Sequence, residues 1–341
     1  MKSNRAALVA GAVLAAALLA ALVAIATSSD ELVSALGLIA WWTVAVAVAL
    51  GFAAFLALRR RGGALKVAAT IVAAAMGAAV AFSASVYVVA PSLLFYPHFD
   101  EESFAQLQAQ PQAEERSLDT GAGRLSGWLL HTAPDGAPLV VYFYGNGQNA
   151  APLLTGFQNN DRLGAFEGYN IAVLDYPGYG KTEGEPSEAS LKAFGLAVYD
   201  ALAERDDVDP ARMAVFGYSI GTGVATYVAS LRDVDSLVLM APYASGYDLY
   251  NSMLDVFHGP LGALVAFRME SAEFARDVEA PSLVLTSVDD EMVPSASSER
   301  LAAALPRCTL ATYEGFGHNE YWASPEVRAA ITDFLARERA S

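Results

Sequence analysis

Residues 213–221, with the sequence MAVFGYSIG, decide the fold of this chain. The apolar residues at the start of this segment predict a buried strand, and residues 222–231 can continue as a helix. Between strand and helix lies the pattern Gly-x-Ser-x-Gly, whose glycines allow a tight turn that exposes Ser219 at the edge of a sheet. Ser219 could be an ordinary turn residue. The strand before it and the helix after it favour a nucleophile.

Buried strands and helices alternate along the rest of the chain. Apolar runs typical of strands covered on both faces occur at 139–144, 171–174, 213–216, 237–240 and 283–286. Helix-like segments lie at 187–204, 220–231, 297–305 and 325–337. A hairpin is expected at 116–120 and 124–131, and a last strand at 308–313. This order predicts an α/β fold, a mostly parallel sheet with helices on both faces, whose ligands gather at the carboxyl ends of the strands.

A serine needs a base to act as a nucleophile, and the candidates for that base are few. The four histidines are His98, His131, His258 and His318. In the chain order serine, acid, histidine, the base must follow Ser219, which leaves His258 and His318. Because His318 lies between the last predicted strand and the last predicted helix, at the carboxyl end of that strand, it is the predicted base.

The acid that orients the base is expected after the strand at 283–286. Asp289, Asp290 and Glu291 all lie there, and solvent-exposed charge is the ordinary fate of such a cluster. The oxyanion of the reaction also needs donors. These are predicted to be the backbone N–H groups of Ile220 and of Asn146, which lies in a glycine-containing loop that could also be a plain turn.

The N-terminal third predicts a membrane anchor over residues 1–93. Three apolar stretches, 6–27, 32–58 and 65–89, each have about the length of a transmembrane helix. A buried core helix is the alternative for any one of them, and the first could be a signal peptide cleaved after Ala26. An irregular membrane-proximal connector is expected at 94–115, and a catalytic domain with a short cap insert at 244–280 follows over 116–341.

Charges between the apolar stretches predict the orientation of the anchor. Basic residues stand before the first stretch and between the second and third, whereas acidic residues follow the first. The basic residues are Lys2, Arg5, Arg59, Arg60, Arg61 and Lys66, and the acidic ones are Asp30 and Glu31. By the positive-inside rule the third helix leads outward, which predicts an integral membrane protein with an extracytoplasmic catalytic domain.

Composition excludes several other classes of function. With 37 acidic and 21 basic residues, the chain lacks the basic surface that nucleic acid requires. Its one cysteine, Cys308, forms no intramolecular disulfide, and we expect it in the core. Gly180-Lys181-Thr182 looks like the end of a P-loop, but Asp175 stands where that motif needs glycine. No metal-ligand spacing is present either, so no cofactor and no metal are expected.

Three motifs resemble those of a known family. Residues 175–184, DYPGYGKTEG, are similar to a loop of the α/β-hydrolase superfamily, and within it of the membrane-anchored Bem46/ABHD13-like group. Residues 290–294, DEMVP, resemble the family's Asp-x-x-Val-Pro signature, and Gly317-His318 resembles its Gly-His. The resemblance selects Asp290 over Asp289 as the triad acid. Tyr144-Gly145 departs from the family's usual His-Gly, which puts the local hydrogen bonding of this loop in question.

The resemblance implies a serine hydrolase that cleaves an ester or thioester bond. Ser219, Asp290 and His318 would form the catalytic triad. The expected substrate is a small-molecule or lipid-like acyl ester, and apolar residues of the cap insert could line an acyl pocket or simply pack. A serine peptidase of the same fold and a non-catalytic membrane-anchored binding module are the alternatives.

Overall fold

A computed structural model describes residues 43–50, 63–120, 123–134, 136–160, 162–253, 255 and 257–340. The chain divides into two compact units, Met1–Leu94 and Phe95–Ser341. The predicted apolar stretch 6–27 lies outside the described residues, and only 43–50 of the stretch 32–58 lies inside them, as a helical segment.

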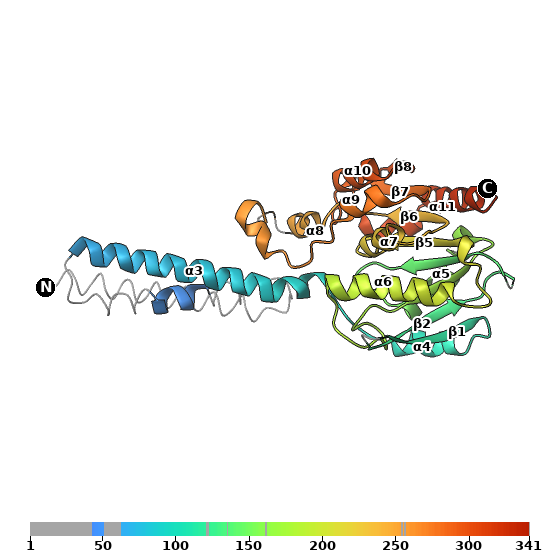
Figure 1. The fold of residues 1–341 in the computed structure, drawn as a ribbon, viewed down its shortest axis with the longest axis horizontal. Helices are drawn as coiled ribbons and strands as arrows, with labels where there is room; N and C mark the ends of the chain where they lie inside the picture. Colours follow the sequence, from blue (N-terminus) through green and yellow to red (C-terminus); the bar gives the residue numbers. More distant parts are fainter. Residues whose placement is uncertain are drawn as a thin grey trace. The chain divides into compact units, whose positions relative to one another are not determined.

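The first unit contains the long helix α3 (Gly63–Leu94, Figure 1). Its 32 residues span about 48 Å at 1.5 Å per residue. The window Val67–Ala84 has a mean hydropathy of 2.0, and α3 is the one helix among the described residues that is long and apolar enough to cross a membrane. This helix covers the third predicted stretch.

The second unit is built on an eight-stranded sheet in the order β1-β2-β4-β3-β5-β6-β7-β8. The strands are β1 (Ala113–Thr120), β2 (Gly123–Leu130), β3 (Leu139–Phe143), β4 (Asn170–Leu174), β5 (Met213–Tyr218), β6 (Ser236–Met240), β7 (Ser282–Ser287) and β8 (Cys308–Tyr313). β1 pairs with β2, and β2 with β4, in antiparallel fashion, whereas all the later pairs are parallel. The prediction of a mostly parallel α/β sheet is confirmed.

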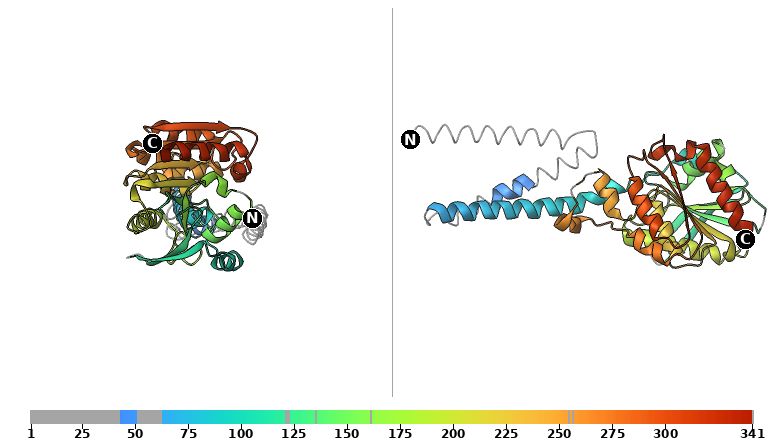
Figure 2. Two further views of the ribbon diagram at one scale, coloured as in Figure 1. Left: turned by 90° about the vertical axis from the view of Figure 1, so that its right-hand side faces the viewer. Right: turned by 90° about the horizontal axis from the view of Figure 1, so that it is seen from above.

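Helices cover both faces of this sheet (Figure 2). They are α4 (Glu101–Gln108), α5 (Ala150–Asn159), α6 (Glu188–Ala203), α7 (Gly221–Ala229), α8 (Gly246–Met253), α9 (Ser271–Phe274), α10 (Ser295–Ala304) and α11 (Pro325–Ala340). Short 3-10 helices are η1 (Leu163–Phe166), η2 (Pro210–Arg212), η3 (Gly259–Leu264), η4 (Ala275–Asp277) and η5 (His318–Ala323).

Alternating side chains of the central strands form a core on each face. Neighbours in a strand point to opposite faces. Tyr142 of β3 stacks on Phe216 with ring centroids 4.7 Å apart, and Phe157 of α5 lies 5.6 Å away on the same side. Phe143, the next residue, faces Phe194 of α6 at 6.2 Å. Because β3, β5, β6 and β7 are buried along their length, they read in the sequence as continuous apolar runs.

Two predictions about local structure are wrong. The expected irregular connector contains α4 and the first residues of β1, because Phe104 and Leu107, three residues apart, bury one face of a short helix. The Phe104 ring lies 5.0 Å from that of Trp128 in β2. Cys308 is half-buried rather than a core residue, because β8 is the edge strand of the sheet.

Candidate active site

The turn between β5 and α7 places Ser219 at the carboxyl end of the sheet. Ser219 has φ +52°, a left-handed conformation that is strained for a residue with a side chain. A Cβ on Gly217 would lie 2.6 Å from Thr222 Cα, and one on Gly221 would lie 2.2 Å from the carbonyl oxygen of Phe143. The Gly-x-Ser-x-Gly pattern therefore reflects two positions where the backbone leaves no room for a side chain.

The structure brings Ser219, His318 and Asp290 together from three loops. His318 Nε2 lies 2.9 Å from Ser219 Oγ, and His318 Nδ1 lies 2.8 and 3.0 Å from the two carboxylate oxygens of Asp290. All three residues are at least nine-tenths buried, with exposed fractions of 8%, 3% and 6%. This chain of contacts has the geometry of a nucleophile, a base and an orienting acid.

Asp290 is the member of the acidic cluster that contacts the histidine. Its Oδ1 also accepts hydrogen bonds from the backbone N–H groups of Met292 and Val293, at 2.9 and 2.8 Å. Burial alone would raise the pKa of Asp290, but the hydrogen bond and charge of His318, with these N–H donors, hold it below its usual value. Asp289 instead accepts from the backbone N–H of Gly315 at 2.6 Å.

Two tyrosines that sequence reasoning missed complete the surroundings of the triad. Tyr218 donates from its hydroxyl to the carbonyl of His318 at 2.7 Å, and its ring stacks on the imidazole with centroids 5.5 Å apart. Tyr321 donates to Asp290 Oδ2 at 3.1 Å and accepts from the backbone N–H of Ser287 at 2.8 Å. Tyr218 is a variable position of the Gly-x-Ser-x-Gly pattern and Tyr321 lies in no motif, and the partners of both come from distant segments.

One predicted oxyanion donor, Ile220, follows Ser219 directly, and the other, Asn146, follows Gly145, which lies close to Ser219. A Cβ on Gly145 would lie 3.4 Å from Ser219 Cβ, which places the start of the loop after β3 close to Ser219. Within the described part of the chain, the backbone N–H groups of Ile220 and Asn146 donate no hydrogen bond to protein. Tyr144, which replaces the family's histidine, has hydrogen bonds of its own: its hydroxyl donates to Asp175 at 3.1 Å and accepts from Tyr176 N–H at 3.0 Å.

His131, His258 and Cys308 take no part in the contacts among Ser219, His318 and Asp290. His131 pairs with Glu114, and His258 pairs with Asp255 on an exposed part of the cap insert. Burial raises the pKa of the Cys308 thiol to about 11, which disfavours the reactive thiolate. Among the residues that the structure describes, no group of three or more His, Cys, Asp and Glu side chains could hold a metal ion.

The cap insert contributes buried apolar groups near the site. Tyr243 donates from its hydroxyl to the carbonyl of Ile220 at 3.1 Å. Phe267 lies 6.4 Å from the Tyr243 ring and 5.6 Å from that of Phe95. Phe257, Val265 and Phe267 are buried, whereas Met253 and Leu261 are exposed; Leu254 lies outside the described residues.

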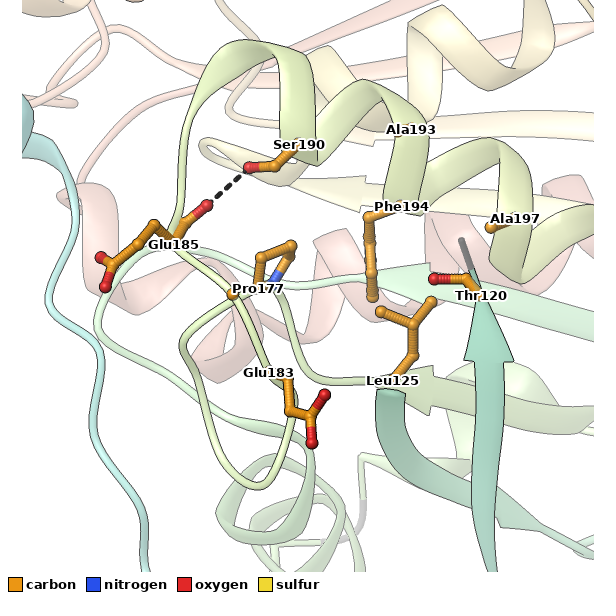
Figure 3. Close-up of a pocket in the computed structure, with 10 residues that line it drawn as sticks. Thr120, Leu125, Pro177, Glu183, Glu185, Ser190, Ala193, Phe194 and Ala197 are labelled. Carbon is orange, nitrogen blue, oxygen red and sulfur yellow. Dashed lines mark hydrogen bonds between the residues drawn. The ribbon is translucent and has the colours of Figure 1, made fainter. Parts of the chain in front are cut away.

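A cavity of about 370 Å³ lies apart from the triad (Figure 3). Its walls come from the β1–β2 hairpin, α6 and the loop that joins β4 to α6, and the side chains of Phe194 and Leu125 face each other across it. Glu183 at this cavity accepts from Arg124 N–H at 3.1 Å. Ser219, Asp290 and His318 are not among the residues that line it.

Comparison with known proteins identifies the family. A family model described as the alpha/beta hydrolase fold matches residues 138–272. An uncharacterised protein of Mycobacterium tuberculosis strain H37Rv is 35% identical over 216 residues, which are 62% of this chain and 74% of that protein. The chain belongs to the α/β-hydrolase superfamily, and its fold and relatives are those of hydrolases.

A more distant relative and a solved structure are also similar to this chain. The lysophosphatidylserine lipase ABHD12 of Xenopus tropicalis is 25% identical over 248 residues, 61% of this chain and 60% of that protein. The Pyrococcus furiosus esterase Pf2001 superimposes with a TM-score of 0.57 at 16% identity, over 72% of this chain and 98% of the esterase. At that identity, the likeness to the esterase shows the fold alone.

Replacing Tyr321 with Phe should destabilise the protein. The substitution leaves the buried N–H of Ser287 without its acceptor and takes one donor from Asp290, so we expect the free energy of unfolding to fall by about 1–3 kcal/mol. Urea denaturation of the detergent-solubilised chain measures this change.

Tyr250→Phe is the matched control, because the buried hydroxyl of Tyr250 has no hydrogen-bond partner among the described residues. Its removal should change stability by less than about 0.5 kcal/mol or increase it. Equal losses in the two variants would show that the Tyr321 hydroxyl does not support the site.

Proposed function

We propose that this chain is a serine hydrolase that cleaves carboxylic ester or thioester bonds through an acyl-enzyme. The supporting observation is the continuous contact from Ser219 Oγ through His318 to the Asp290 carboxylate, with distances of 2.9 and 2.8 Å. A buried serine with an imidazole at hydrogen-bond distance can lose its proton as it attacks a carbonyl carbon.

The proposed reaction has two halves. Ser219 Oγ attacks the carbonyl while His318 Nε2 takes its proton, and Asp290 stabilises the imidazolium that forms. His318 then returns the proton to the leaving alcohol or thiol, and the acyl group stays on Ser219. In the second half, water attacks the acyl-enzyme with His318 as its base, which releases the acid and restores Ser219.

Two backbone N–H groups are proposed to bind the oxyanion of each tetrahedral intermediate. Ile220 supplies one, at the start of α7, where the helix dipole also favours negative charge. Asn146 supplies the other from the loop beside Ser219. Both N–H groups lack a protein acceptor among the described hydrogen bonds, as donors reserved for a substrate would.

A lipid-like acyl ester is the proposed substrate. A relative is named a lysophosphatidylserine lipase, and α3 is apolar enough to bring the enzyme to a membrane. Buried apolar residues of the cap insert, among them Phe267 and Val265, lie in the segment that follows Tyr243, which itself contacts the nucleophile turn. These groups favour an acyl chain over a peptide, whose amides would need polar partners.

Ser219→Ala should abolish ester hydrolysis. Loss of the nucleophile is expected to lower kcat for a p-nitrophenyl ester by about 10⁴-fold or more. Ser282→Ala is the control, because Ser282 is also buried but lies at the opposite, amino end of β7, and this variant should keep its activity. Undiminished turnover by Ser219→Ala would remove the proposed nucleophile.

Chain-length profiling tests the proposed substrate class. A lipid-like substrate predicts that kcat/KM rises by at least tenfold from acetate to an ester of eight or more carbons, since each buried methylene contributes about 0.8 kcal/mol. The assay uses p-nitrophenyl esters of increasing length on the full chain. A preference for acetate would exclude the lipid pocket but leave the hydrolase intact, and cleavage of peptide amides alone would favour a peptidase.

We also propose that the catalytic unit faces the extracytoplasmic side, on the distribution of basic residues around the apolar stretches. Alkaline phosphatase, which is active only outside the bacterial cytoplasm, should be active when fused after Ser341. The same reporter inserted at the basic joint near Arg60 should be inactive. The reverse pattern would place the catalytic unit in the cytoplasm.

A further inference from the structure

Asp175 is a buried charged residue that the proposed mechanism leaves without a role. It follows β4 at the carboxyl edge of the sheet, and its exposed fraction is 6%. Among the described residues no lysine or arginine forms a salt bridge with it. Burial raises its pKa to about 6, against the lowering effects of its hydrogen bonds with Ala150 and Tyr144 and of the charge of nearby His98.

The carboxylate of Asp175 joins the two ends of one loop. Its Oδ1 accepts from the Tyr144 hydroxyl at 3.1 Å and from the backbone N–H of Ala150 at 2.7 Å. Residues 144–150, which we call the oxyanion loop, run between these two contacts and contain Asn146. Tyr176, the next residue after Asp175, adds two bonds to Tyr144: its N–H donates to the Tyr144 hydroxyl, and its own hydroxyl donates to the Tyr144 carbonyl at 2.7 Å.

The middle of the oxyanion loop is held by the same neighbouring turn. Tyr179 donates from its hydroxyl to Asn146 Oδ1 at 2.9 Å. Gly180 has φ +55°, and a Cβ on it would lie 2.0 Å from Asp175 Oδ2, so the turn packs closely around the carboxylate. The backbone N–H of Tyr96 also reaches Asn146 Oδ1, at 3.3 Å.

We propose that Asp175 is a positioning residue for the oxyanion loop: its carboxylate fixes both ends of the loop and so keeps the backbone N–H of Asn146 in place beside Ser219. This inference rests on the proposed function. Hydrogen bonds to an ionised acceptor are roughly twice as strong as neutral ones, so the charge of Asp175 matters as well as its shape. Ala150 is also the first residue of α5, where the helix dipole favours a negative charge.

The titration of Asp175 gives this role a distinct pH dependence. Because its pKa in the folded protein lies above the usual value for an aspartate, the protonated form is favoured in the fold. Stability linked to this group is therefore greatest at low pH and is lost as pH rises through about 6. The ionised carboxylate of Asp175, which forms the stronger hydrogen bonds to the loop, is thus the form that lowers the stability of the folded protein.

Asp175→Asn in the full chain separates a positioning role from a structural one. The amide resembles the protonated acid, so at pH 8 we expect kcat for a p-nitrophenyl ester to fall about tenfold, a part of the 10²–10³-fold loss on deleting an oxyanion donor. KM should stay within about twofold, and the melting temperature at pH 8 should be equal to or above that of the wild type.

The ratio of wild-type to variant kcat is the sharpest readout. It should decline from about ten at pH 8 to about two at pH 5, because about nine-tenths of Asp175 is then protonated. Asp235→Asn is the control, since burial also raises the pKa of Asp235 but this residue lies at the amino end of β6. Its kcat ratio should stay near one throughout.

Wild-type kcat in Asp175→Asn, or a loss of kcat accompanied by a lower melting temperature and unchanged across pH, would overturn the inference. If that variant does not fold, Tyr144→Phe tests the same contact, with an expected loss of several-fold in kcat at constant KM. An inactive wild type that also resists fluorophosphonate labelling would instead overturn the proposed function.

Discussion

The site depends on one tight turn, in which Ser219 adopts a left-handed backbone conformation at the end of β5. Side chains at Gly217 and Gly221 would collide with the backbone of α7 and of β3, so the turn exists only because both positions lack a Cβ. The strain is held by the neighbouring strands, since the N–H of Ser219 donates to the Met240 carbonyl at 2.9 Å. A residue held in this way by rigid strands needs little further ordering before it reacts.

Two buried carboxylates at the carboxyl edge of the sheet have pKa values shifted in opposite directions, because their surroundings differ. Asp290 has an imidazole and backbone donors around it, and its pKa lies below the usual value. Asp175 has hydrogen bonds but no cation in a salt bridge among the described residues, and its pKa is raised to about 6. Asp290 therefore stays ionised over a wide pH range, whereas Asp175 can change its charge near pH 6. Two residues of one type thus differ through what surrounds them.

Much of the fold could be predicted from the sequence because its signals are local. The apolar runs of β3 to β7 and the pattern around Ser219 need no knowledge of distant contacts, and the chain order of serine, acid and histidine restricted the base to two residues. The choice of Asp290 over Asp289 needed the family motif, since both follow the same strand. In the structure, Asp289 turns to Gly315 while Asp290 faces His318. The sequence does not predict helix α4, because its apolar face is short and lies among glutamines and glutamates. It gives no sign of the contacts of Tyr321 and Asp175, because their partners are far apart in the chain.

If Ser219 is the nucleophile, a fluorophosphonate should form a covalent adduct with it in the full chain. Peptide mass spectrometry should find the phosphonate on Ser219 alone. Labelling should be lost in His318→Ala, because the base that activates the serine is gone. An adduct on any other residue, or no adduct on a folded protein, would contradict the account.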